Sequence, residues 1–296
     1  MKIGFITYSF TAACRAGELD IFKMIDWIVE KGGEHLEISP SPATVMLNGD
    51  PAMTDKVRDY AAKRGLPLSS YTVGANFLTV TDENGVTRNK TAEERRAEIE
   101  RVKTEVDVAA RLGVHRMRHD VGYRAQADCT LANFEADLPL AVEACREIAD
   151  YAAQFDIVTS TENHGYHFQG SERIGRLVAG VNRPNYRTTL DVGNFVCADE
   201  DPEIAVMNNL PIASMIHFKD FYLRKQVLCP DQWGMTRHGR YFRGAVTGCG
   251  DVDLPSIVKL IKASGYDGFL SIEYEGKEPN LAACEMALAN VRKLFA

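Results

Sequence analysis

The sequence predicts an α/β fold, a closed (β/α)₈ barrel that occupies residues 1–296 as a single domain. Eight short strand-like runs alternate with helix-like segments along the whole chain. Each return to a parallel neighbour needs a crossover of about a dozen residues, so this alternation indicates a parallel sheet. A chain of 296 residues suits one barrel, and no linker-like or low-complexity segment divides it. A doubly wound open sheet is the alternative architecture.

The predicted strands share apolar and β-branched residues and short length. In chain order they are KIGFITYSF (2–10), HLEISP (35–40), LPLSSYTV (66–73), HRMRHDVG (115–122), DIVTSTENHG (156–165), YRTTLDVGNF (186–195), ASMIHFKDFY (213–222) and GFLSIEYEG (268–276). The clearest helices between them are 21–33, 91–113, 133–155 and 254–265. Thr91 with Glu94 three residues later is typical of a helix start, and Gly265 of a helix end.

Composition and charge favour small-molecule chemistry over nucleic-acid or membrane binding. The net charge is −7 and 45% of the residues are hydrophobic, so electrostatics give no general attraction to a phosphate backbone or an anionic membrane. The first ten residues are too few to span a membrane and lack a signal-peptide pattern, so we expect a cytoplasmic protein that begins at Met1. The seven cysteines are scattered without a C-x-x-C pair, which indicates reduced thiols.

Four chemically reactive side chains stand at the ends of four successive predicted strands. They are Glu162, Asp191, His217 and Glu273, and each follows an apolar or β-branched stretch. Barrel enzymes place their chemistry at the carboxyl ends of the strands. We therefore expect these four side chains to converge at one mouth of the barrel.

Three carboxylates so close together would repel one another and raise one another's pKa unless a cation neutralised them. A divalent metal ion is the simplest cation for this purpose. Oxygen ligands with one nitrogen suit Mn²⁺, which is our first choice, or Mg²⁺, Co²⁺ or Zn²⁺. Such a site leaves coordination positions for substrate oxygens, and a metal there would stabilise the charge formed when a proton is removed next to a carbonyl.

The motifs TENHG (161–165), LDVGNF (190–195), MIHFKD (215–220) and SIEYEG (271–276) resemble the sugar phosphate isomerase/epimerase family of xylose isomerase-like TIM barrels. The resemblance covers nearly the whole chain. It implies the barrel fold and one divalent ion on Glu162, Asp191, His217 and Glu273. It also implies a mechanism, in which the metal holds two adjacent substrate oxygens while Glu162 and Glu273 move protons on opposite faces of an enediolate.

Further residues are candidates for substrate contact. Because alternate strand residues share a face, His164 should accompany Glu162 into the pocket and Lys219 should accompany His217, while Glu275 lies near them. A strand-end residue that merely faces solvent is the alternative for each. Asn194 stands where some relatives carry a substrate-binding histidine, and this departure weakens the sugar assignment.

Two strand residues from the first half of the chain complete the candidate substrate contacts. Glu37 matches a carboxylate on the second strand of the family, and we expect it to orient substrate or a neighbouring ligand. Arg118 could form a bidentate pair with a substrate carboxylate or phosphate. An Arg–Asp pair that braces the strand is the alternative for Arg118.

The long connection at about 220–250 is predicted to be an active-site lid. Between 219 and 246 it carries six basic residues against Asp220 and Asp231, and the basic residues are Lys219, Arg224, Lys225, Arg237, Arg240 and Arg243. This local excess suggests an anionic substrate group, with Arg243 among its contacts, although a solvated loop explains it equally well. The loop at 39–50 could cover the opposite rim.

The predicted function is metal-dependent isomerisation or epimerisation of a ketose, keto-sugar or sugar phosphate. The alternative is a dehydratase or lyase of the inosose, dehydroshikimate or C-glycoside-cleaving type, in which Arg118 would bind a carboxylate and His164 would protonate the leaving group. Endonuclease IV shares this barrel but needs three metals and a basic surface. A non-catalytic sugar-binding protein would not need both glutamates. Apolar helix residues at 281–295 suggest a possible homo-oligomer.

Overall fold

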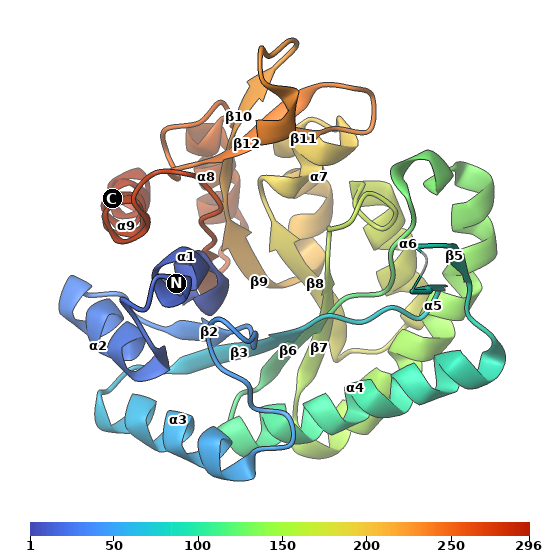
Figure 1. The fold of residues 1–296 in the computed structure, drawn as a ribbon, viewed down its shortest axis with the longest axis horizontal. Coiled ribbons are helices and arrows are strands. Elements are labelled where there is room, and N and C mark those ends of the chain that lie inside the picture. The colour runs from blue at the N-terminus through green and yellow to red at the C-terminus, as the bar shows by residue number, and fades with distance from the viewer. Residues whose placement is uncertain (84) are drawn as a thin grey trace.

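The computed structural model, which describes residues 1–83 and 85–296, contains a closed barrel of eight parallel strands (Figure 1). In order around the barrel these are β1 (Lys2–Ile6), β13 (Phe269–Ile272), β9 (Ala213–Phe218), β8 (Tyr186–Asp191), β7 (Val158–Glu162), β6 (Arg116–His119), β3 (Leu68–Val73) and β2 (Leu36–Ile38). Pairing of β1 with β13 joins the first strand to the last and closes the sheet. The predicted barrel is thereby confirmed over the open-sheet alternative.

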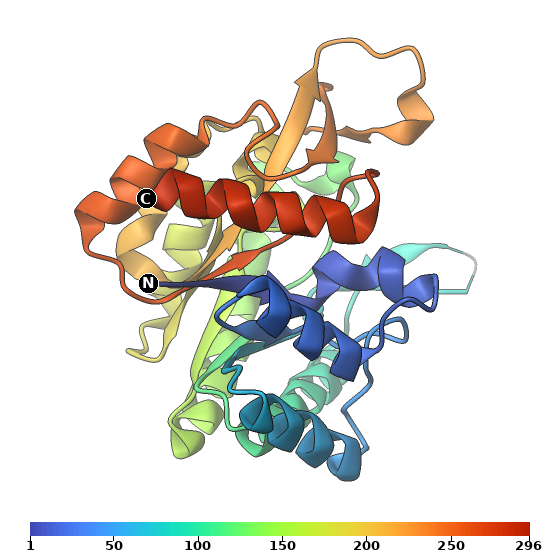
Figure 2. The same cartoon turned by 90° about the vertical axis from the view of Figure 1, so that its left-hand side faces the viewer.

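Helices surround the barrel on its outer face (Figures 1 and 2). They are α1 (Thr11–Arg15), α2 (Ile21–Lys31), α3 (Pro51–Lys63), α4 (Ala92–Leu112), α5 (Leu131–Ala152), α6 (Ser171–Val181), α7 (Pro202–Asn209), α8 (Leu254–Ser264) and α9 (Asn280–Phe295). The expected caps are present: Thr91 and Glu94 form a capping box on α4, and Gly265 ends α8 with a φ of 71°. None of the helices in the described ranges is long and apolar enough to cross a bilayer.

The hydrophobic core lies between the helices and the outer face of the sheet. Helix residues such as Ile25, Ile28 and Val106 are fully buried there. The inside of the barrel, by contrast, holds buried polar side chains near the carboxyl ends of the strands, among them Glu37, Arg118 and His217. Burial of ionisable groups is costly unless they are paired, so this polar interior marks a functional site.

Several strands are shorter than the sequence predicted, and the difference matters at the mouth. The first strand stops at Ile6, and residues Thr7–Phe10 form a 3₁₀ turn instead of continuing the strand. Tyr8, within that turn, is 44% exposed and faces the barrel mouth rather than the core. Strand β9 likewise stops at Phe218 and does not continue to Tyr222.

The segment after β9 forms a second sheet instead of an irregular loop. Strands β10 (Asp220–Arg224), β12 (Tyr241–Ala245) and β11 (Gly234–Met235) pair antiparallel in the order β10-β12-β11. We call residues 220–245 the arm, which projects from the barrel mouth at the top of Figure 2. Asp220 fixes its base, because its carboxylate accepts hydrogen bonds from the backbone N–H groups of Phe221, Gly248 and Gly250. A separate hairpin joins β4 (Thr79–Thr81) to β5 (Thr87–Asn89).

Candidate active site

The four predicted ligand residues meet at the carboxyl end of the barrel. Glu162, Asp191, His217 and Glu273 each offer one ligand atom, and these atoms lie within 4.8 Å of one another. All four side chains are buried. Asp191 Oδ2 and Glu273 Oε2 are buried and accept no hydrogen bond of good geometry from the described residues, although Lys219 lies within ion-pair distance of both. Orphaned oxygens beside a ring nitrogen fit a divalent cation well.

Glu37 orients His217 from the floor of the site. Its Oε2 lies 2.9 Å from His217 Nε2, and Ser271 Oγ donates to the same oxygen at 2.7 Å. If Nε2 carries the proton, Nδ1 keeps a free lone pair, and this atom lies 3.2 Å from Glu162 Oε1 and 3.1 Å from Glu273 Oε2. Glu37 is fully buried and lines neither cavity described below, so its position supports ligand orientation rather than substrate contact.

Lys219 and Asn194 lie against the same cluster. The Lys219 ammonium is 3.4 Å from Asp191 Oδ2, 3.3 Å from Glu273 Oε2 and 3.2 Å from Glu275 Oε2. Burial opposes the charge on Lys219, but these carboxylates hold its pKa well above its ordinary value. Asn194 accepts from Lys219 at 3.3 Å and donates through Nδ2 to Glu162 Oε1 at 3.2 Å.

Arg118 is occupied by carboxylates of the protein itself. Its Nη2 lies 2.9 Å from Glu162 Oε2 and also contacts Asp120. The Arg–Asp brace considered from the sequence is therefore present, with Glu162 as a further partner. A guanidinium engaged in this way, and only 8% exposed, does not support the expected contact with an anionic substrate group.

The protonation balance of the cluster also favours a cation. Burial, reinforced by Glu162 and Glu273, raises the pKa of Asp191 to about 8, although Lys219 opposes the shift. Burial works against the Glu162 carboxylate as well, but Arg118 and His217 hold its pKa well below the ordinary value. The pKa of His217 is raised despite burial because Glu37 and Glu162 face the ring. In the metal-free protein, protons on Asp191 and His217 and the charge of Lys219 thus offset the negative charge that a divalent ion would neutralise.

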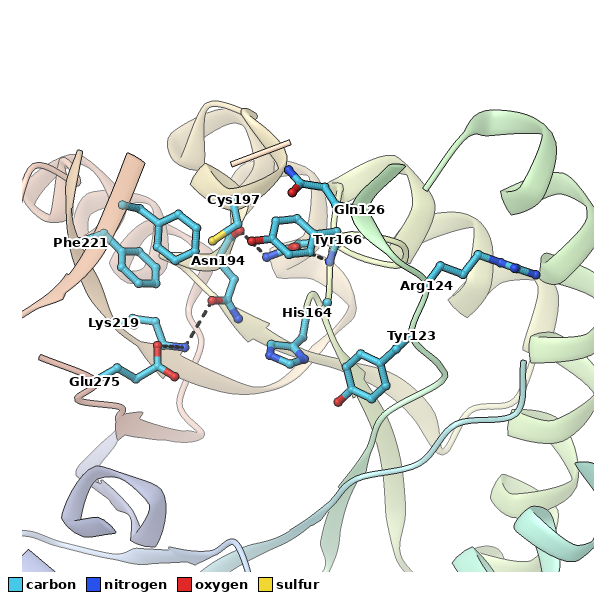
Figure 3. Close-up of a pocket in the computed structure, with 13 residues that line it drawn as sticks. Tyr123, Arg124, Gln126, His164, Tyr166, Asn194, Cys197, Lys219, Phe221 and Glu275 are labelled. Carbon is cyan, nitrogen blue, oxygen red and sulfur yellow. Dashed lines mark hydrogen bonds and ion pairs between the residues drawn. The ribbon is translucent and has the colours of Figure 1, made fainter. Parts of the chain in front are cut away.

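Two cavities border this cluster. The inner cavity, about 220 Å³, is lined by Tyr8, Arg118, Asp120, Glu162 and Glu273, with others around them. The outer cavity, about 450 Å³, is lined by Tyr123, Arg124, Gln126, Gly165, Tyr166, Gln169, Asn194, Cys197, Lys219, Phe221 and Phe242 (Figure 3). His164 and Glu275 line both cavities. The predictions that His164 and Lys219 point into the pocket agree with their positions, although both residues follow the end of their strand.

The arm forms one wall of the outer cavity and is tied to the barrel loops opposite. Tyr166 donates its hydroxyl to Met235 O at 2.8 Å, and Gln126 Nε2 donates to Thr236 O at 2.6 Å. The backbone N–H of Arg237 donates to Cys197 O at 2.9 Å. These three bonds join the arm to the loops after β7, β6 and β8, and a lid function of this segment stays a prediction.

Arg243 lies outside both cavities, contrary to the expected substrate contact. Its guanidinium stacks on the rings of Trp233 and Tyr222, at 4.8 Å and 5.5 Å from their centroids. Because alternate strand residues face opposite sides, β12 directs Phe242 into the outer cavity and Arg243 away from it. The other basic residues of the arm do not line the cavities either, with the exception of Lys219 at its base.

Several cavity residues were not predicted from the sequence. Tyr8 was assigned to a strand, and Tyr123, Tyr166 and Gln169 lie in loops after predicted strands. Aromatic residues in the loops at the carboxyl ends of barrel strands are the signal that could have identified the two later tyrosines.

Comparisons with known proteins agree with this geometry. A sequence profile described as xylose isomerase-like TIM barrel matches residues 25–294. Among solved structures, D-psicose 3-epimerase from Clostridium cellulolyticum H10 aligns with a TM-score of 0.74 and 16% identity, over 100% of this chain and 99% of that chain. A 3-keto-D-glucoside 4-epimerase from E. coli aligns with a TM-score of 0.72 and 16% identity, over 99% of each chain.

A dehydratase is also similar to this chain. The probable 3-DHS dehydratase from Bacillus anthracis aligns with a TM-score of 0.69 and 17% identity, over 100% of this chain and 99% of that chain. A comparison with curated protein sequences found no match. At such low identities the structural similarity establishes the fold alone. The sequence profile, however, covers most of the chain. The protein therefore belongs to the xylose isomerase-like TIM barrel family.

Proposed function

We propose that this protein is a divalent-metal-dependent isomerase or epimerase of a sugar or related keto-polyol. The observation that carries the proposal is the buried convergence of Glu162, Asp191, His217 and Glu273. Glu162 and Glu273 also line the inner cavity, so the carboxylates that would bind the metal are within reach of a substrate. A substrate in that cavity would meet two carboxylates as proton acceptors and donors.

The residues around the cluster support enolisation of a substrate carbonyl. A divalent ion, with Mn²⁺ as first choice, would polarise the carbonyl as a Lewis acid. Arg118 holds Glu162 and Lys219 holds Glu273, so both glutamates are kept ionised and ready to take a proton. Glu37 fixes the ring of His217, and His164 lies where it could contact a substrate hydroxyl. A cytoplasmic location and a homo-oligomer stay predictions.

The contacts in the site give little support to the dehydratase alternative. Its predicted form needs Arg118 to bind a ring carboxylate, and this guanidinium already pairs with Asp120 and Glu162. His164 would still be available as an acid, since it lines both cavities. We therefore place isomerisation first.

Metal analysis followed by a substrate panel in deuterated water tests the proposal. The panel contains ketoses, an inosose and dehydroshikimate, incubated with the manganese-loaded protein. Isomerisation or epimerisation incorporates solvent deuterium at carbon, which mass spectrometry and NMR detect. Loss of water with a new ultraviolet chromophore would instead identify the dehydratase. Absence of both reactions in protein that contains manganese would contradict the proposed function.

A further inference from the structure

The inner and outer cavities differ in chemistry. Around the inner cavity, Tyr8, Asp120 and the metal-site glutamates present polar atoms. The outer cavity is about twice as large and is flanked by four aromatic rings, which belong to Tyr123, Tyr166, Phe221 and Phe242. A single sugar ring beside the metal ligands would fill the inner cavity and leave the outer one vacant.

The aromatic walls of the outer cavity come from opposite sides of the barrel mouth. Phe221 and Phe242 of the arm pack edge to face with centroids 5.2 Å apart. Figure 3 shows Phe221 on one side of the cavity and Tyr123 on the other, with His164 between them. Rings on two sides of a cavity offer apolar contact surface to a flat, apolar group.

The polar groups of the outer cavity are largely bonded within the protein. Gln169 accepts from the Tyr166 backbone N–H at 2.6 Å and donates to Asn194 O at 2.8 Å. Gln126 donates to Thr236 O, and the Tyr166 hydroxyl donates to Met235 O. A second sugar, with many hydroxyls, would find few partners here, whereas an apolar ring needs none.

The cations that line the outer cavity are already neutralised. Lys219 pairs with Asp191, Glu273 and Glu275, and Arg124 pairs with Asp137. In the described part of the chain, no unpaired arginine or lysine lines either cavity. A phosphate or carboxylate on the substrate would therefore have to compete with carboxylates of the protein.

From these observations we infer that the substrate is a neutral keto-glycoside, with a ketone on its sugar ring and a flat, apolar aglycone. The sugar ring occupies the inner cavity beside Glu162 and Glu273, and the aglycone occupies the outer cavity between the arm and Tyr123. His164 and Glu275, which line both cavities, flank the glycosidic link. This inference rests on the proposed function, because it assumes that the ketone of the sugar ring is enolised at the metal centre.

Calorimetric titration of the manganese-loaded protein with matched phenyl and methyl glycosides of glucose and galactose, which lack the ketone and so bind without reacting, tests the inference. We expect a phenyl glycoside to bind about tenfold more tightly than its methyl counterpart, because the aromatic walls bury the added ring. Phe242→Ala should lower this preference several-fold. Trp233→Ala is the matched control, since Trp233 belongs to the arm but stacks on Arg243 outside the cavity, and it should retain the preference.

Equal affinity for phenyl and methyl glycosides, or failure of both to bind protein that holds manganese, would overturn the inference. Tighter binding of cellobiose or of glucose 6-phosphate than of the phenyl glycoside would also overturn it, by showing a polar or anionic occupant. Protein that binds no manganese would instead contradict the proposed function, so the two failures are distinguishable.

Discussion

Glu162 and Glu273 carry the proposed proton transfers, and each lies beside a different cation, Arg118 or Lys219. We expect Glu162→Gln and Glu273→Gln each to lower the rate of solvent deuterium exchange by about 100-fold or more, because general acid–base groups contribute factors of that size. The measurement uses manganese-saturated protein with its metal content determined. Glu285→Gln, at an exposed position, is the control and should retain the rate. Full activity of either cluster variant would contradict the assigned roles.

Glu37 is proposed to act through His217 rather than on substrate. Glu37→Gln removes the charge that faces Nε2, so manganese affinity should fall about 10- to 100-fold, as is usual when the partner of a ligand histidine is lost. Electron paramagnetic resonance of free manganese measures this affinity. Glu34→Gln, at an exposed position of the same segment that lines neither cavity, should bind manganese normally. Unchanged affinity of Glu37→Gln would show that the ring needs no such partner.

At the residue scale, the sequence identified side chains that end a strand, because the strand end fixes their position. Glu162, Asp191 and Glu273 were predictable for this reason. The family resemblance implied that Glu37 orients substrate or a neighbouring ligand, but its partner His217 was not predictable, because the contact crosses the barrel interior between strands that are far apart in the chain. The sequence left the choice between a substrate contact and an Arg–Asp brace open for Arg118, and it did not place Arg243 outside the cavities, because charge alone does not reveal that Asp120, Glu162 or an aromatic stack already occupies a guanidinium.

At the scale of elements, the arm closes one side of the outer cavity through a few hydrogen bonds. Tyr166→Phe keeps the aromatic ring but removes the bond to Met235 O. Loss of one such bond is worth about 1 kcal/mol, so KM should rise about fivefold with little change in kcat. Tyr222→Phe is the matched control, because Tyr222 stacks on Arg243 away from the cavity. An unchanged KM for Tyr166→Phe would show that this bond does not hold the arm over the substrate.

The arm was predicted as a long lid, but its sheet was not. The predicted strand ran through Asp220 to Tyr222, because apolar and aromatic residues continue past Phe218. The carboxylate of Asp220 instead binds backbone N–H groups around Gly250, which turns the chain away from the barrel and starts β10. Pairing of β10 with β12 joins residues that are distant along the sequence, and local composition does not specify such contacts.

At the scale of the whole molecule, metal binding should be linked to proton release. The pKa of Asp191 is raised to about 8, and that of His217 is raised as well, so both carry protons at neutral pH in the metal-free protein. A metal must displace these protons, so its affinity should rise with pH through about 8, by about tenfold per pH unit for each proton displaced. Titration calorimetry in buffers of different ionisation enthalpy counts the protons. Affinity that is independent of pH between 6 and 8 would contradict this electrostatic account.

One divalent cation should bind between three carboxylates and one imidazole at the barrel mouth. Anomalous diffraction from a manganese-soaked crystal measures this binding. We expect a single strong anomalous peak between Glu162, Asp191, Glu273 and Nδ1 of His217. A map without a peak there, or with the four side chains turned away from one another, would contradict it.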